Sequence, residues 1–195
     1  MSSGTIIGID PGSRHTGYAL LQQEGSDYRA LECGVIHTDH LKDHTERLLL
    51  IYKEVEKLIR KFKPDHGAVE TPVYGVDPLA MLKLGRAQAA AILALTAQGV
   101  AVGEYYPKTV KKSITGNGNS AKSQVAYMLA KMISVPDLPL SPDAADALAV
   151  AWCHSVNLQS PSGSKKNKKY HQNNRKSDWA DFIEQNPDRV NRRTR

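Results

Sequence analysis

The sequence predicts an α/β protein in which a mixed sheet is flanked by helices. Three short strands come first and are separated by turns, which is the pattern of an antiparallel meander. Two further short strands then alternate with longer segments of helical periodicity, which is typical of parallel strands joined by crossover helices. With 195 residues the chain is long enough for one domain with a substantial core.

The first strand, Ile6–Asp10, is an apolar run that ends in a carboxylate. Its β-branched residues suit a strand buried on both faces. Pro11 and Gly12 end the strand, so Asp10 should lie at its carboxyl end, where open α/β sheets place their sites. Asp also commonly caps Pro-Gly turns. This stretch alone therefore does not decide whether Asp10 is a site residue or a turn cap.

The other elements follow from periodicity and from turn residues. Strands are expected at Thr16–Gln23, Arg29–His37, His66–Glu70 and Val100–Tyr105, and helices at Thr45–Phe62, Pro78–Gln98, Ser120–Ile133 and Pro142–Val156. The last helix has a clear start signal, with Ser141 as N-cap and Pro142 at the first helical position.

The helix expected at Pro78–Gln98 is apolar nearly all round, apart from Lys83, Arg86 and Gln88. This pattern predicts burial on two sides, one against the core and the other a candidate surface for a partner subunit. The chain shows no amino-terminal signal segment and no uninterrupted apolar stretch that could span a membrane. Its two cysteines form no CxxC motif, which favours a reducing, cytoplasmic location.

The net charge of +6 lies entirely in the carboxyl-terminal tail. Residues 1–159 carry 16 basic and 16 acidic side chains, whereas residues 160–195 carry 10 basic and 4 acidic ones. The sequence therefore divides into a body at residues 1–158 and a basic tail at 159–195, whose composition predicts disorder. Any affinity of the body for phosphates must come from local placement of charge.

Four acids are candidates for a metal site. Glu70 repeats the pattern of Asp10, a strand followed by an acid and then a proline, while Asp143 and Asp146 share one helix face. The helix dipole alone explains Asp143, but Asp146 lies among alanines and should be buried with a partner. Four gathered carboxylates repel unless hard divalent cations bind, and two Mg²⁺ ions suit phosphodiester hydrolysis.

The segment Thr115–Ser123 resembles a phosphate-binding P-loop, but Ala121 replaces the second glycine and no buried strand precedes it. Lys122 lies in the first turn of a helix, where the dipole disfavours a cation. This placement makes sense if Lys122 and the helix start hold a phosphate. Upstream, Lys108, Lys111 and Lys112 add charge or form a solvated face.

An aromatic residue and a pair of histidines are also candidate binding residues. Tyr74, in the loop after Glu70, either stacks on a nucleobase or lies on the domain surface. His40 and His44 are four residues apart, but no third ligand is near them, and no zinc site is expected there.

At this point the chain resembles the RuvC-type Holliday-junction resolvases of bacteria, from Ile6 to His154. Five motifs in the right order carry the resemblance: Gly8–Arg14 with Thr16–Tyr18, Val69-Glu70, Leu82–Gly85, Lys122–Val125 and Asp143–Ala149. The family has Phe in the loop after the glutamate, where this chain has Val73 followed by Tyr74. It also often has Lys in that loop, where this chain has Gly75–Asp77.

The resemblance implies a ribonuclease-H-like fold, a homodimer paired through the Ala-rich helix, and a four-way junction as substrate. It implies Mg²⁺, two ions per site and replaceable by Mn²⁺, and RuvA-RuvB as partners. Asp10, Glu70, Asp143 and Asp146 become metal ligands, and Lys122 joins them as a catalytic residue. The expected DNA contacts are Arg14, Tyr74, Lys83, Arg86, Lys108, Lys111, Lys112 and Lys122.

Two other functions remain as alternatives. One is an ATPase or kinase-like protein of the same fold, which generally needs a second lobe that this chain is too short to supply. The other is a junction-binding protein without chemistry, against which the presence of all four acids argues. The tail is expected to tether DNA or to dock around Trp179–Ile183, or else to act only as a solubilising extension.

Overall fold

The computed structural model describes residues 4–73, 75, 77–135 and 140–159. In chain order its elements are β1 (Gly4–Asp10), β2 (His15–Glu24), β3 (Asp27–His37), α1 (His44–Phe62), β4 (His66–Glu70), α2 (Pro78–Ala97), β5 (Ala101–Tyr105), α3 (Pro107–Thr115), α4 (Lys122–Met132) and α5 (Pro142–Gln159). The predictions made for Tyr74 and for residues 160–195 lie outside the described residues.

The sheet confirms the predicted mixed topology. Its five strands follow the order β3-β2-β1-β4-β5. The first three strands pair antiparallel, and β4 pairs parallel with both β1 and β5. Every strand and helix expected from the sequence is present, with boundaries that differ by a few residues.

Helix α3 is the element that the sequence analysis missed. Pro107 occupies its first turn, Val110 and Ile114 bury one face, and Gly116 ends it with a left-handed φ of 76°. A proline at the start and a glycine just past the end are standard helix signals. The three lysines between them obscured the short apolar face.

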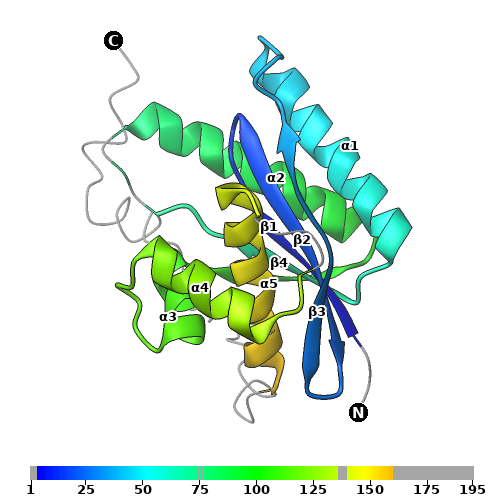
Figure 1. Cartoon of the computed structure of the whole chain (residues 1–195). Helices are drawn as coiled ribbons and strands as arrows, with labels where there is room; N and C mark the ends of the chain where they lie inside the picture. The colour runs from blue at the N-terminus through cyan, green and yellow to red at the C-terminus, as the bar shows by residue number, and fades with distance from the viewer. Residues whose placement is uncertain (1–3, 74, 76, 136–139, 160–195) are drawn as a thin grey trace, which may run out of the picture. The chain divides into compact units, whose positions relative to one another are not determined.

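Two hydrophobic clusters cover the two faces of the sheet. Side chains alternate along a strand, so Ile6 of β1 belongs to the cluster formed with α3, α4 and α5. Ile7 and Ile9 belong to the opposite cluster, formed with α1 and α2. Figure 1 shows α5 lying across one face, with α1 and α2 behind the sheet.

Helix α5 approaches the sheet so closely that two positions beneath it, Gly8 and Gly17, have no room for a side chain. A Cβ atom added to Gly8 would overlap the carbonyl oxygen of Ala147 and lie 2.7 Å from the amide nitrogen of Ala151. A Cβ atom on Gly17 of β2 would overlap the carbonyl oxygen of Asp143. Small residues on both elements therefore set the height of α5 above the sheet.

Among the residues that the structure describes, helix α2 packs one side against the core. Ala87, Ala91 and Leu95 face the core, whereas Leu79, Leu82 and Leu93 are 59%, 50% and 60% exposed. By length and composition alone α2 could cross a membrane, but a core helix passes the same test. The second apolar side, which the sequence assigned to a partner subunit, is open to solvent here.

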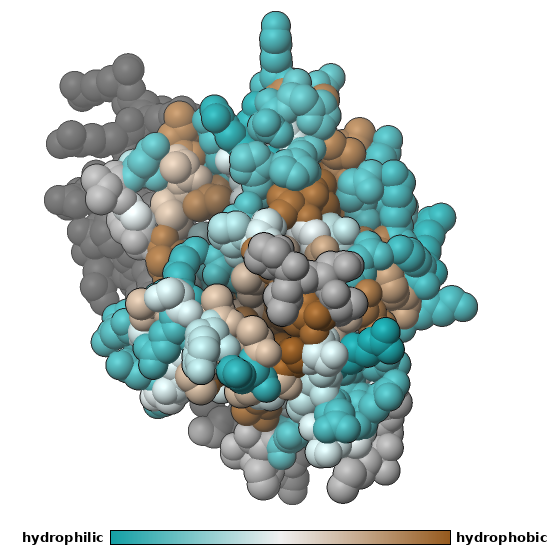
Figure 2. All heavy atoms as spheres, in the orientation of Figure 1, coloured by the Kyte–Doolittle hydropathy of each residue, from teal (hydrophilic) through white to brown (hydrophobic). Residues whose placement is uncertain are grey.

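Hydrophilic residues dominate the periphery of the face shown in Figure 2, and hydrophobic residues gather nearer its middle. Apolar side chains exposed in this way are common on the surface of folded proteins.

Gly8→Ala is expected to destabilise the protein by about 1–3 kcal/mol or more, because backbone atoms of α5 must move to admit the new methyl group. Denaturant unfolding measures this change. Gly4→Ala is the matched control in the same strand, since its Cβ atom would meet only Asp65, at 3.8 Å. Equal losses of stability in the two variants would contradict the account of α5 packing.

Candidate active site

Asp10 ends β1 at a turn that is held by its own hydrogen bonds. The hydroxyl of Thr16, which is fully buried, donates to the carbonyl of Gly12 at 2.8 Å and accepts from the amide of Gly12 at 3.3 Å. A Cβ atom on Gly12 would overlap the carbonyl oxygen of His15, so only glycine fits there. The turn leaves Asp10 half-buried at the carboxyl end of the strand.

Strand alternation directs Asp10 and Glu70 to the face that α5 covers. Gly8 contacts α5, and Asp10 lies two residues further along the same strand, on the same face. Ala68 belongs to the α5 cluster, so Glu70 faces that way as well. The parallel pairing of Ile9 with Val69 brings the two acids to neighbouring strand ends.

Helix α5 brings the other two acids to the same edge of the sheet. The Ser141 hydroxyl accepts a hydrogen bond from the Ala144 amide at 3.4 Å, which confirms the predicted helix start. Gly17 pairs with Asp10 across β1 and β2, and it also lies directly beneath Asp143. One helical turn later Asp146 is half-buried over the same strands.

Each of the four acids lies close enough to at least one of the others for their charges to interact. Burial, followed by the charges of Asp146 and Asp143, raises the pKa of Asp10 to about 6. Burial, followed by the charges of Asp10 and Asp146, raises the pKa of Glu70 to about 7. The structure thus brings together the four carboxylates that the sequence singled out.

Lys122 is a basic residue of this site. Its ammonium group donates to the Asp146 carboxylate at 2.5 Å, and this hydrogen bond raises the pKa of Lys122. Its side chain is 73% exposed, so the charge can also reach a ligand from solution. Lys111 lies near enough to lower the pKa of Glu70.

The donor set fits a hard divalent cation. Carboxylate oxygens are the ligands that Mg²⁺ prefers. Burial and then the neighbouring carboxylates raise the pKa values of Asp10 and Glu70, and the charges of Lys122 and Lys111 do not cancel the shift of Glu70. Within the described part of the chain, no three of these four carboxylates place oxygens within 4.8 Å of one another. Carboxylates brought closer together without a cation would repel more strongly.

The remaining predicted DNA contacts fall into separate groups. Lys108 and Lys112 are exposed on α3, beside the loop that leads to Lys122. Arg14 is exposed in the turn after Asp10. By contrast, Lys83 and Arg86 lie on α2 near His44, whose pKa they help to lower.

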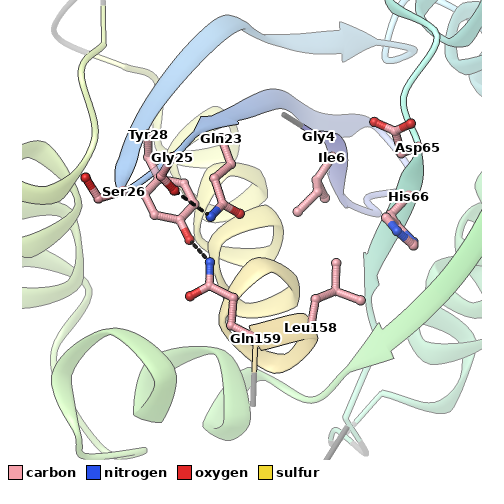
Figure 3. Close-up of a pocket in the computed structure, with 10 residues that line it drawn as sticks. All are labelled: Gly4, Ile6, Gln23, Gly25, Ser26, Tyr28, Asp65, His66, Leu158 and Gln159. Atoms are coloured by element: carbon pink, nitrogen blue, oxygen red, sulfur yellow. Dashed lines mark hydrogen bonds between the residues drawn. The ribbon is translucent and has the colours of Figure 1, made fainter. Parts of the chain in front are cut away.

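A separate hollow lies at the opposite end of β1. It encloses about 830 Å³ and is lined by Gly4, Ile6, Gln23, Gly25, Ser26, Tyr28, Asp65, His66, Leu158 and Gln159. Figure 3 shows Gln159 donating to the Tyr28 hydroxyl, at 2.6 Å, and Gln23 donating to the Gly25 carbonyl, at 3.0 Å. None of the four acids lines this hollow, so it is not the candidate active site.

The structure also places together three side chains that the sequence analysis did not connect. His15, His37 and Asp39 hold one ligand atom each within 4.8 Å of the others. The signal was present in the predicted hairpin, because His15 precedes its first strand and His37 ends its second. Only the register of the hairpin shows that they are opposite each other.

Glu70→Gln is expected to stabilise the metal-free protein more at pH 8 than at pH 5. The pKa of Glu70 rises from 4.5 to about 7 on folding, so ionisation costs native stability progressively between those values. Gln carries no charge at either pH. Thermal unfolding in a chelating buffer measures the difference, and an equal change in Tm at pH 5 and pH 8 would refute repulsion as its cause.

Comparison with known proteins agrees with this geometry. The model of the family described as "Crossover junction endodeoxyribonuclease RuvC" matches residues 6–154. The RuvC protein of Salinibacter ruber is 43% identical over 95% of this chain and 98% of its own length, and that of Cytophaga hutchinsonii is 40% identical over 95% and 87%.

A solved structure, "T. thermophilus RuvC in complex with Holliday junction substrate", is also similar. It shares 31% identity and a TM-score of 0.73, covering 78% of this chain and 93% of that one. The expected ribonuclease-H-like fold is thereby confirmed. The chain belongs to the RuvC family of crossover junction endodeoxyribonucleases.

Proposed function

We propose that this protein is a metal-dependent endonuclease that resolves four-way (Holliday) DNA junctions by paired symmetric nicks, in recombination and repair. The observation that carries the proposal is the convergence of four carboxylates on the edge of the sheet beneath α5. The solved RuvC complex with a Holliday junction substrate supports the same substrate for this chain. Neither an ATPase nor a binding protein without chemistry is favoured by these findings.

Asp10, Glu70, Asp143 and Asp146 would hold the cations, which we propose to be two Mg²⁺ ions replaceable by Mn²⁺. Bound divalent cations supply activation of water and neutralisation of charge at the leaving oxygen. Lys122 places an ammonium group beside the same carboxylates and adds positive charge where the phosphate develops negative charge. Ionisation of Asp10 and Glu70 opens the site to cations near neutral pH.

DNA would approach along the basic side chains around the acids. Lys108, Lys111 and Lys112 of α3 lead to Lys122, and Arg14 follows the turn beyond Asp10. Contacts to phosphates from such residues position a duplex without reading its sequence. Lys83 and Arg86 would contact an arm of the junction that lies farther from the acids. Val73, which is 53% exposed, and Tyr74 are our candidates to wedge into the junction.

The exposed side of α2 suits a homodimer. Leu79, Leu82 and Leu93 present apolar surface that a second copy of the helix would cover. A two-fold dimer places two identical sites against the two-fold symmetry of a junction, which accounts for symmetric nicks. We further propose that the dimer acts in the cytoplasm with the RuvA-RuvB complex, and that the basic residues 160–195 tether DNA.

Asp146→Asn is expected to reduce cleavage of a synthetic mobile junction in Mg²⁺ by at least about 100-fold while junction binding persists, because one anionic ligand is lost. Cut sites are mapped on junction and linear duplex. Asp27→Asn, at an exposed acid that begins β3, is the matched control and should cut at the wild-type rate. Unchanged cleavage by Asp146→Asn would contradict the assignment of the four carboxylates as the nuclease active site.

Leu82→Glu is expected to shift the protein from dimer to monomer, because a charge would enter the apolar side of α2. Light scattering after size-exclusion chromatography measures the mass. Leu49→Glu on α1 is the control, since Leu49 is 53% exposed on a different helix. If the dimer survives Leu82→Glu, or if Leu49→Glu disrupts it equally, the exposed side of α2 is not the dimer interface.

A further inference from the structure

We propose that His15, His37 and Asp39 form a second metal site, selective for Zn²⁺ and similar transition-metal ions. This site is chemically distinct from the four carboxylates. It is built from two imidazoles and one carboxylate, whereas the candidate active site offers only oxygen ligands. Imidazole nitrogen is a poor ligand for Mg²⁺ and a good one for Zn²⁺.

The geometry brings three ligand atoms around one point. His15 opens β2 and His37 closes β3, and the two are register partners across the antiparallel pair. Their rings meet edge to face, with centroids 5.2 Å apart. Nε2 of His15 lies 3.8 Å from Oδ1 of Asp39, and all three ligand atoms lie within 4.8 Å of one another.

These separations are close to those of a zinc site. Zn–N and Zn–O bonds of about 2.0–2.1 Å in a tetrahedron place ligand atoms roughly 3.3 Å apart. Small rotations of exposed side chains close the remaining gap, since His15 and Asp39 are 45% and 52% exposed. Three protein ligands leave a fourth position for water.

The backbone that carries these ligands is fixed from within. Thr38, between His37 and Asp39, is fully buried. Its amide donates to the carbonyl of Arg14 at 2.8 Å, and its hydroxyl donates to the carbonyls of Ser13 and Arg14 at 3.1 and 3.0 Å. The end of β3 is therefore tied to the turn just before His15, so binding needs little reordering of the backbone.

A bound ion would link that turn directly to the end of β3. Asp10 lies at the other end of the same turn, and Arg14 is the neighbour of His15. The expected consequence is a more stable β1–β2 turn when zinc is bound, in addition to any effect of Mg²⁺ at the acids.

Zinc binding to the full-length, untagged protein tests the site, measured by isothermal titration calorimetry with Mg²⁺ in large excess. Wild type is expected to bind one zinc equivalent that His15→Ala and His37→Ala lose, or bind at least about tenfold more weakly. His40→Ala is the matched control, an exposed histidine of the adjoining loop, and should keep that equivalent. Asp10→Asn should also keep it, since the acids form a separate site.

Thermal unfolding provides the second readout. Zinc should raise the Tm of wild type and His40→Ala, but not that of His37→Ala or of the nearly isosteric Asp39→Asn. Zinc affinity that is unchanged in both His37→Ala and Asp39→Asn would overturn the proposal. So would loss of the zinc equivalent in Asp10→Asn, since that result assigns the ion to the acids. Junction cleavage in Mg²⁺ monitors the proposed nuclease independently.

Discussion

The close contact between the backbone of α5 and that of β1 and β2 determines where the four acids meet. Gly8 and Gly17 place no side chain between the layers, and Ala147 and Ala151 contribute only methyl groups from the helix. Interiors packed at this density transmit displacement instead of absorbing it. A methyl group added at either glycine would therefore move Asp143 and Asp146 relative to the strand-end acids.

This packing also imposes an electrostatic cost on the fold. Partial burial and like charge raise the pKa values of Asp10 and Glu70, so the metal-free site opposes folding near neutral pH. The ion pair between Lys122 and Asp146 offsets only part of the repulsion. Unfavourable charge of this kind is typical of ligand-binding and catalytic sites. A bound divalent cation would neutralise it, which is why the same carboxylates suit such cations.

The candidate site was largely predictable because its pattern is local in sequence. A strand ending in an acid before Pro predicted Asp10 and Glu70, and three-residue spacing on a helix predicted Asp143 and Asp146 on one face. Helix α3 was missed because its apolar face is short and its lysines dominate the segment. The partner of Lys122 was missed as well, since Asp146 lies 24 residues away.

The sequence by itself determined the order of every element except α3, the mixed sheet and the identity of the acids, because periodicity and turn residues act over short stretches of chain. Only the tertiary structure decided which distant side chains meet. A shift in strand register between Leu20 and Leu21 changes the pairing of β2 with β3, so that His37 is opposite His15. One residue of register moves a strand's side chains to the other face, and sequence periodicity does not report such a shift.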